Sequence, residues 1–421
     1  MTPPARDARQ AATQIVAKLR DQGHTAYLAG GCVRDALLGH TPKDYDVATD
    51  ATPDQVQALF TQSAAVGAAF GVVIVYRSAT ERRPRWVTEV ATFRAEGAYS
   101  DGRRPDEVRF TTAEEDAKRR DFTINGLFAE PDPDRPDRPE ADRVIDFVDG
   151  RADLVARRIR AIGDAGDRFG EDYLRMLRAV RFAARLGFEI ETKTQAAIRA
   201  HARYLGRISR ERIGQELLAM LTGPAPAQAL RLLQRLKLDA PTLNEDPADP
   251  ALNASTKLPE HASAPARLAA WLIDRHGRDA DHERLIQRWR GALSLSNDHR
   301  DDLKKLLNAL PTLEAWTTLP RAAQKRTAIQ PHWDQALALF GAIGGDAQRL
   351  ADDAHALASD GIGLAPTPLV TGDDLIDLGH RPGPGFKTLL DEVYDQQLEG
   401  QLATRDDALA YLAETQPPRR G

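Results

Sequence analysis

Apolar residues along this chain recur with two different periods, and the change between them divides the sequence. In roughly the first 150 residues, short apolar runs typical of strands alternate with short stretches of helical spacing. From Asp167 onward the spacing is almost entirely helical. The pattern therefore predicts strands and helices in the first part of the chain and helices in the rest.

The N-terminal part carries clear start and stop signals. Thr52 and Pro53 are typical of a helix N-cap and the first helical position, and Gly39 ends the short helix that follows two glycines. We expect helices over residues 6–21, 52–60 and 113–120, and strands at 26–28, 45–48, 70–76, 85–93 and 144–148. Further along we expect helices over 167–186, 192–202, 209–221 and 226–236, with a linker at 241–265.

The stretch 28–49 carries the first chemistry. Gly30 and Gly31 let the backbone approach a bound group closely, and the helix start that follows presents free N–H groups to an anion. Asp44 and Asp46 lie two residues apart in an expected strand, so both carboxylates face one side and repel each other unless protonated, hydrogen-bonded or bridged by a cation. Mg²⁺ suits such a pair when substrate phosphates complete its shell. The combination favours nucleotidyl transfer; an ordinary turn and a solvated loop are the alternative.

A third carboxylate lies in the expected strand 85–93. Glu89 shares its parity with apolar neighbours on both sides, so we expect it on the buried face of that strand. An acid on a buried face needs a partner. A metal shared with Asp44 and Asp46 would supply one, and an ion pair with a nearby arginine is the alternative.

The expected helix 167–186 carries a row of arginines. Arg175, Arg178, Arg181 and Arg185 recur every three or four residues and form one face. Four stacked guanidinium groups need anions beside them, which a nucleoside triphosphate or an RNA backbone would supply. The alternative is a solvated basic face balanced by a neighbouring acidic helix.

Asp172 and Arg175, one turn apart, suggest how a base could be chosen. Cytosine and adenine both present an amino donor beside a ring-nitrogen acceptor, which match a carboxylate acceptor and a guanidinium donor. Uracil and guanine present a carbonyl and a ring N–H at these positions. Their carbonyl would face the carboxylate, acceptor against acceptor, and their N–H would face the guanidinium, donor against donor. Each buried group left unpaired costs about 1–3 kcal/mol, so one Asp/Arg pair could select CTP and ATP together.

Composition limits the remaining possibilities. The 421 residues, 42% hydrophobic and 28% charged, are typical of a globular protein with two or more packed units. No stretch has the length of a membrane span, and the N-terminus lacks a signal-peptide core, so we expect a cytoplasmic protein. The net charge of −5 hides a basic middle, because residues 151–212 hold 15 Lys and Arg against 8 Asp and Glu. A polyanion such as RNA would lie along this middle.

Taken in order, these motifs resemble the class II tRNA nucleotidyltransferase and bacterial poly(A) polymerase family. The match runs from about residue 26 to residue 236. It consists of the Gly-Gly and Asp-x-Asp motif (28–49), a third carboxylate (89–94), a flexible loop (99–105), a ribose-binding motif (119–125), a base-reading motif (171–182) and a helix-capping motif (208–216).

The resemblance implies an α+β architecture in three parts: a nucleotidyltransferase head with a mixed sheet (1–150), a helical neck with the base-reading helix (151–240), and a helical body and tail that bind tRNA (241–421). It implies that Asp44 and Asp46 hold two Mg²⁺ ions with Glu89 assisting, while the RNA 3′-hydroxyl attacks the α-phosphate in line. It also implies nucleotide binding by Gly30, Gly31, Arg34, Arg120, Asp121, Asn125, Asp172, Arg175, Arg178 and Arg181.

Within this family, the strand at 70–73 and the loop 99–105 are more similar to the branch that adds C-C-A to tRNA 3′ ends from CTP and ATP. We expect a monomer with no membrane partner. An A-adding enzyme and a poly(A) polymerase remain alternatives, because the same base-reading pair would serve both. A catalytically silent RNA-binding protein is the alternative from another class, and the intact carboxylates argue against it.

Overall fold

A computed structural model describes residues 5–65, 71–77, 85–96, 108–131, 143–380, 382–383 and 385–415. The expected flexible loop 99–105 and residue 70 of an expected strand lie outside these ranges. The chain divides into two compact units. The first unit comprises Met1–Pro247 with Ala292–Ser294, and the second comprises Ala248–Gly291 with Leu295–Gly421.

The first unit begins with a mixed sheet. Seven described strands pair in the order β3-β4-β5-β2-β1-β8-β9, and only β2 and β5 pair in parallel. The strands are β1 (Ala26–Ala29), β2 (Asp46–Thr49), β3 (Ser63–Ala65), β4 (Val72–Arg77), β5 (Trp86–Thr92), β8 (Leu127–Ala129) and β9 (Val144–Asp146). A separate two-stranded ribbon joins β6 (Arg94–Glu96) to β7 (Val108–Phe110).

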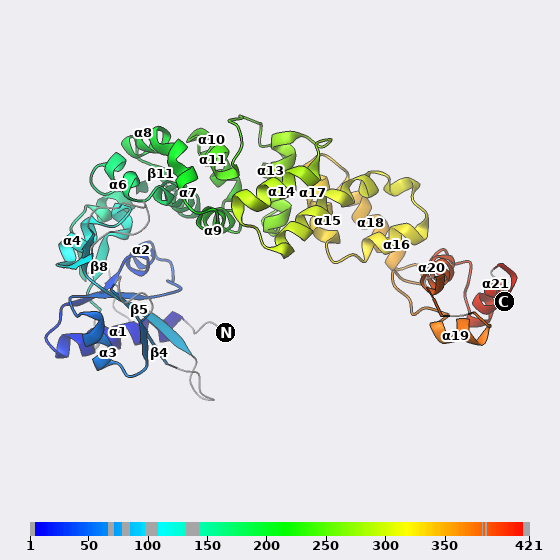
Figure 1. Ribbon diagram of the computed structural model, residues 1–421, viewed down its shortest axis with the longest axis horizontal. Coiled ribbons are helices and arrows are strands. Elements are labelled where there is room, and N and C mark those ends of the chain that lie inside the picture. The colour runs from blue at the N-terminus through cyan, green and yellow to red at the C-terminus, as the bar shows by residue number, and fades with distance from the viewer. Residues whose placement is uncertain are drawn as a thin grey trace. The chain divides into compact units, whose positions relative to one another are not determined.

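Short helices connect these strands. Helix α1 (Ala5–Asp21) packs its apolar stripe, including the buried Ile15, Val16 and Leu19, against β1, β2 and β5 (Figure 1). The Thr52 hydroxyl caps α3 (Pro53–Leu59) in a capping box with Gln55, as the sequence predicted. The remaining helices of this region are α2 (Gly31–Leu37), α4 (Ala113–Lys118) and the 3₁₀ turn η2 (Thr123–Asn125).

Helices then dominate the first unit. α9 and α10 pack against α7, whose Leu177 and Val180 are fully buried. The elements in order are α5 (Gly150–Val155), β10 (Arg158–Ile159), α6 (Ala165–Glu171), α7 (Leu174–Leu186), β11 (Glu189–Ile190), α8 (Thr192–His201), η4 (Ala202–Arg207), α9 (Arg210–Leu221), α10 (Pro226–Arg235) and α11 (Asp239–Leu243). The expected helices at 192–202, 209–221 and 226–236 are confirmed.

The expectation of one continuous helix over 167–186 is wrong. The structure has two helices, because the backbone of Asp172 is extended, with φ −150° and ψ 103°. The Asp172 carboxylate accepts the Leu174 N–H at 3.0 Å and so satisfies a free donor at the start of α7. An apolar stripe alone could not reveal this break, because it records which positions are apolar and not the backbone angles of a single residue.

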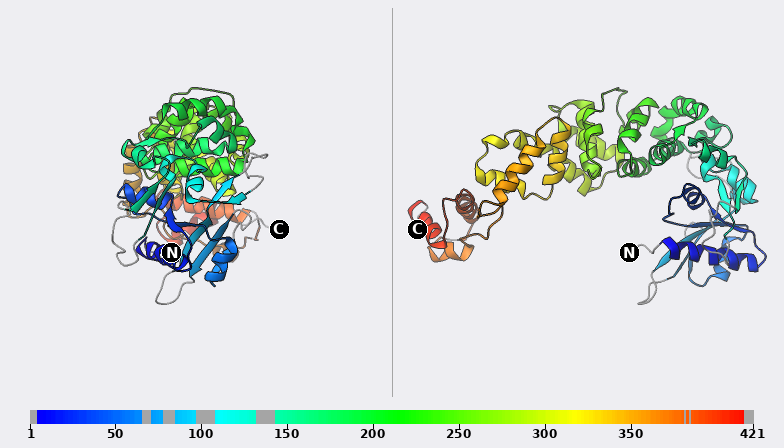
Figure 2. Two further views of the ribbon diagram at one scale, coloured as in Figure 1. Left: turned by 90° about the vertical axis from the view of Figure 1, so that its left-hand side faces the viewer. Right: turned by 180° about the vertical axis from the view of Figure 1, so that it is seen from behind.

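Every described element after β11 is a helix (Figure 2), which confirms the α+β architecture. The elements after α11 are α12 (Asn253–Lys257), α13 (Ala264–His276), α14 (His282–Leu293), α15 (Asn297–Glu314), η5 (Trp316–Thr318), α16 (Arg321–Ala328), α17 (Trp333–Ala342), α18 (Ala347–Ala358), α19 (Gly372–Asp377), α20 (Gly385–Leu398) and α21 (Arg405–Thr415). None of the described helices is long and apolar enough to cross a membrane.

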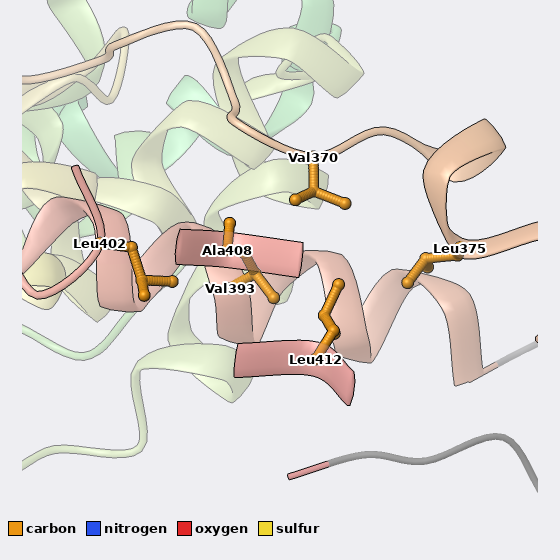
Figure 3. Close-up of a cluster of buried hydrophobic side chains, with 6 residues drawn as sticks. All are labelled: Val370, Leu375, Val393, Leu402, Ala408 and Leu412. Atoms are coloured by element: carbon orange, nitrogen blue, oxygen red, sulfur yellow. The ribbon is translucent and has the colours of Figure 1, made fainter. Parts of the chain in front are cut away.

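The last three helices share a small core of their own. Figure 3 shows side chains from α19, α20, α21 and the adjoining segments turned toward one another. Leu375 and Ala408 are fully buried in it. Burial of these apolar side chains holds the C-terminal end of the second unit together.

Candidate active site

The predicted site residues meet at one cavity of the first unit, with a volume of about 880 Å³. Every one of them except Asp44 lines it. The lining side chains come from the central strands β1, β2 and β5, from α2, from the segment after α4 and from α7, so the cavity lies between the mixed sheet and the helices that follow it. The fold therefore assembles residues more than one hundred positions apart in the sequence.

The acidic wall of the cavity follows from the strand register. β2 and β5 run parallel with Val47 opposite Val90, so Asp46 and Glu89, one residue earlier in each strand, lie side by side. The expectation that Glu89 faces the buried side is wrong. Thr88 and Val90 form the buried face of β5, at 2% and 1% exposure, because α1 packs there. Glu89 instead projects from the open face into the cavity.

Asp44 lies just outside this wall, because the strand begins only at Asp46. Desolvation by the cavity walls, followed by the charge of Glu89, raises the pKa of Asp46 to about 6, although water still reaches its side chain. Arg120 opposes this rise, and the Asp44 charge adds to it. Among the described residues, no three His, Cys, Asp or Glu side chains gather closely enough to hold a metal by themselves.

The glycine turn is built as the sequence predicted. Gly30 is the N-cap of α2 and has a φ of +72°, which a residue with a side chain rarely adopts. A Cβ atom at Gly30 would also lie 2.9 Å from Nη1 of Arg120. The Gly30 N–H donates to the Leu127 carbonyl at 2.9 Å. The positive φ therefore favours glycine here, and the Arg120 guanidinium would have to shift to make room for a side chain.

A hydrogen-bonded chain of cavity residues links α2 to α7; we call it the cavity floor. Nη1 of Arg34 donates to Oδ1 of Asn125 at 2.5 Å, and Nδ2 of Asn125 donates to Oδ1 of Asp121 at 3.0 Å. Arg178 of α7 pairs with Oδ2 of Asp121 at 2.7 Å. Burial alone would raise the pKa of Asp121, but Arg178 and Asn125 outweigh it and lower that pKa to about 2. Asp121 is therefore held ionised.

The arginine row on α7 already has anionic partners within the protein. We expected phosphates to supply them, but each guanidinium group contacts a carboxylate from a different segment. The pairs are Arg175 with Glu171, Arg178 with Asp121, Arg181 with Glu216 and Arg185 with Asp35. The row is thus ordered and partly neutralised before any nucleotide enters.

The proposed base-reading pair lines the same cavity as the carboxylates of the sheet but comes from the helical region that follows the sheet. Asp172 and Arg175 both line the cavity, and the break between α6 and α7 presents the Asp172 carboxylate there. Nη2 of Arg212, from α9, donates to Oδ2 of Asp172 at 2.7 Å. Arg212 lies within the predicted helix-capping motif 208–216 but was not predicted as a site residue, because the motif does not indicate a contact 40 residues away.

Arg168 is a second addition. Its guanidinium donates to the carbonyls of Lys118 at 2.8 Å and Arg119 at 3.1 Å, and its Nε donates to that of Ile162 at 3.2 Å. Lys118 and Arg119 end α4 and directly precede the cavity residue Arg120. One side chain of α6 therefore fixes the segment that carries Arg120 and Asp121.

Comparison with known proteins identifies the family. Residues 26–160 match the family model described as "Poly A polymerase head domain", and residues 187–245 match that of "Probable RNA and SrmB- binding site of polymerase A". The CCA-adding enzyme of Levilactobacillus brevis is 34% identical over 406 residues, which are 94% of this chain and 96% of that protein. The chain belongs to the family of CCA-adding enzymes. The resemblance to tRNA nucleotidyltransferases, the preference for the CCA-adding branch and the prediction of an enzyme are confirmed.

Solved structures agree with this assignment. The crystal structure of the Bacillus stearothermophilus CCA-adding enzyme in complex with CTP has a TM-score of 0.74 and 29% identity, covering 98% of this chain and 97% of that one. The Thermotoga maritima CCA-adding enzyme complexed with tRNA has a TM-score of 0.68 and 20% identity, covering 96% of this chain and 94% of that one. At this lower identity the likeness concerns the fold alone.

Proposed function

We propose that this chain adds C-C-A to the 3′ ends of tRNA without a template, using CTP and ATP and releasing pyrophosphate. One observation carries the proposal: a single cavity joins the carboxylates of Asp46 and Glu89 on one wall to Asp172 and Arg175 on another. The first pair can hold a cation that binds the reacting phosphate. The second pair can form hydrogen bonds with the pairing edge of a base. Membership of the CCA-adding family supports the same reaction.

The acidic wall fits a divalent cation. Asp44, Asp46 and Glu89 concentrate negative charge, and burial together with the charges of Glu89 and Asp44 raises the pKa of Asp46, a rise that a bound cation would oppose. We assign Asp44 and Asp46 as the Mg²⁺ ligands, with Glu89 assisting and substrate oxygens completing the shell. When bound, the ions lower the pKa of the RNA 3′-hydroxyl and neutralise the triphosphate.

The residues between the walls would orient the nucleotide. Gly30 and Gly31 bring the backbone N–H groups of α2 close to the phosphates. Arg34 and Arg120 supply positive charge on the same side of the cavity. Arg178 and Arg181 of α7 complete this lining, held in place by their carboxylate partners.

The ribose would lie against the polar chain on the cavity floor. Asp121 is ionised and accepts hydrogen bonds, so a ribose hydroxyl can donate to it. The amide of Asn125 holds that carboxylate in position at 3.0 Å. A deoxyribose would leave the buried carboxylate with one donor fewer, which favours ribonucleotides.

Base choice rests on Asp172 and Arg175. The Asp172 carboxylate keeps acceptor capacity beyond its bonds to Arg212 and Leu174, so it can accept the amino group of cytosine or adenine. The Arg175 guanidinium can donate to the adjacent ring nitrogen. Arg212 would orient the carboxylate, so that the same pair serves CTP and ATP.

The rest of the chain would hold the RNA. We assign residues 1–150 as the catalytic head, 151–240 as the neck that carries base-reading helix α7, and 241–421 as the body and tail that bind tRNA. The basic balance of residues 151–212 supports a polyanionic partner along the neck. We further propose that the enzyme is a cytoplasmic monomer.

The decisive experiment uses purified protein, Mg²⁺ and three tRNA transcripts that end before C-C-A, after C, or after C-C. Each transcript is offered CTP, ATP or both, and products are sized at single-nucleotide resolution. Extension of all three that stops at C-C-A supports the proposal. Asp46→Ala is the control, and we expect it to abolish extension without unfolding the protein, because it removes a metal ligand.

The other outcomes refute the proposal in different ways. Extension of only the C-C transcript by one A would make the chain an A-adding enzyme. A long A ladder would make it a poly(A) polymerase. Full activity of the Asp46→Ala variant would overturn the assignment of the metal ligands.

A further inference from the structure

A cluster of aromatic and basic side chains lies in the first unit, immediately beside the base-reading turn but outside the cavity. We call it the tyrosine–arginine platform, and it consists of Tyr173, His201, Arg203, Tyr204 and Arg207. None of these five residues lines the cavity, although the neighbours Asp172 and Leu174 of Tyr173 do. The break between α6 and α7 therefore sends two consecutive side chains, Asp172 and Tyr173, into different sites.

The rings of the platform support one another. The ring centroids of Tyr173 and Tyr204 lie 5.3 Å apart, and those of His201 and Tyr204 lie 6.1 Å apart. His201 is fixed because its Nδ1–H donates to the Ala197 carbonyl at 2.8 Å. All three rings are only half-buried. Their contacts hold Tyr204 in one place at the surface.

Tyr204 in turn orders two exposed arginines. The guanidinium carbons of Arg203 and Arg207 both lie 4.7 Å from the centroid of its ring, and Nη2 of Arg203 donates to its hydroxyl at 2.6 Å. Both arginines are exposed, and among the residues that the structure describes neither has an ion pair with a carboxylate. This contrasts with the arginines of α7, all of which are paired with acids.

Two ordered guanidinium groups without acidic partners suit an anion with planar groups. Immobilising an arginine on binding costs side-chain entropy. Because Tyr204 already restricts Arg203 and Arg207 in the free protein, less entropy is lost when a ligand binds. The outer face of each guanidinium can stack on a base, and its free N–H groups can bind phosphate oxygens. The segment 199–212 that carries the platform holds five arginines against one acid, Glu211. Both the shape and the charge fit a single RNA strand better than a protein surface.

We propose that the platform binds the single-stranded end of the RNA substrate next to the terminus being extended, with Arg203 and Arg207 on its phosphates and bases. The inference rests on the proposed function for the identity of the substrate. Tyr173 determines where the RNA end would lie. RNA bound to the platform would lie next to the turn that presents Asp172. The platform would thus hold the 3′ end beside the cavity in which the incoming nucleotide binds.

The test measures binding of a fluorescent tRNA transcript ending before C-C-A to the full chain, over a range of salt concentrations. We expect Arg203→Gln/Arg207→Gln and, separately, Tyr204→Ala to weaken binding roughly ten-fold or more, since stacking and phosphate contacts are lost. The double variant should also flatten the slope of log K against log salt by about 1.5, because two phosphate contacts disappear. The KM for CTP should stay within about two-fold of wild type, because the nucleotide cavity is untouched, and an unchanged melting temperature would exclude a general folding defect.

Lys18→Gln/Arg109→Gln is the matched control, since both residues are exposed and lie outside the cavity in the catalytic head, and the same charge is removed. Tyr204→Phe keeps the ring and should bind almost as wild type does. The inference is overturned if the platform variants bind tRNA as wild type does, or if the control pair weakens binding equally. Because binding is measured without extension, a wild-type protein that binds tRNA but adds no nucleotide would refute the proposed function and leave this test intact.

Discussion

Asp121→Asn tests how the floor of the cavity is held together. Asp121 is 8% exposed and accepts hydrogen bonds from Arg178, from Asn125 and from the Phe122 N–H at 2.8 Å. Asparagine has nearly the same shape but no charge. The substitution therefore removes the ionic part of this network while it leaves the packing in place.

The magnitude follows from the pKa of Asp121. Its value of about 2 in the folded protein lies below the ordinary value of about 3.9, so the ionised group stabilises the fold above pH ~4. The difference corresponds to roughly 2–3 kcal/mol at neutral pH. As the pH falls from about 4 through about 2, wild-type Asp121 becomes protonated and this contribution disappears. The Asp121→Asn variant should thus be less stable than wild type at neutral pH, and this difference in stability should disappear in acid.

Hydrogen exchange of the segment 121–131 reports the free energy of local opening and separates this region from the second unit. Asp149→Asn is the matched control, because the Asp149 side chain is 82% exposed and contacts Arg160 only at 3.9 Å. We expect the control to change stability by no more than about 0.5 kcal/mol. Equal protection in the wild type and in Asp121→Asn at neutral pH would refute the reasoning, as would a gap that persists at about pH 2.

Three further substitutions test neighbouring features. Asp172→Ala should lower the preference for CTP and ATP over UTP and GTP in single-nucleotide extension more than it weakens tRNA binding; an unchanged preference would remove its base-reading role. Arg168→Lys should lower kcat/KM roughly ten-fold with little change in melting temperature, because lysine cannot hold several carbonyls in one plane. Gly150→Ala should destabilise the fold by about 1–3 kcal/mol in thermal unfolding, since its Cβ would lie 2.3 Å from the Thr123 carbonyl oxygen; wild-type stability would contradict this.

Local signals in the sequence predicted five of the eleven described strands and most helices of the first unit. The strands that were missed, β3, β6, β7, β8, β10 and β11, have only two or three residues, too few to show an alternating pattern. The capping box at Thr52 and the glycine turn at Gly30 depend on residues within one turn of the chain, so their sequence pattern determines them. The predicted residues that line the cavity were found through a family resemblance carried by ordered motifs. The structure places them together, and their individual roles in binding and catalysis remain predictions.

The prediction that Glu89 lies on the buried face of its strand was wrong for a physical reason. Alternation along a strand shows which residues share a side, but it does not show which side the rest of the protein covers. Here α1 covers the side of Thr88 and Val90, and Glu89 is left in the open cavity. A short strand with apolar residues on both faces does not contain this information.

The sequence by itself determined the change from a mixed region to a helical one, the glycine turn, and which residues carry charge. Only the tertiary structure decided the break at Asp172 and the partners of the α7 arginines. Arg212 reaches Asp172 from 40 residues away, and Arg185 reaches Asp35 from 150 residues away. The physical reason is that turns and caps are set by neighbouring residues, whereas ion pairs and exposed faces depend on which distant segments pack together.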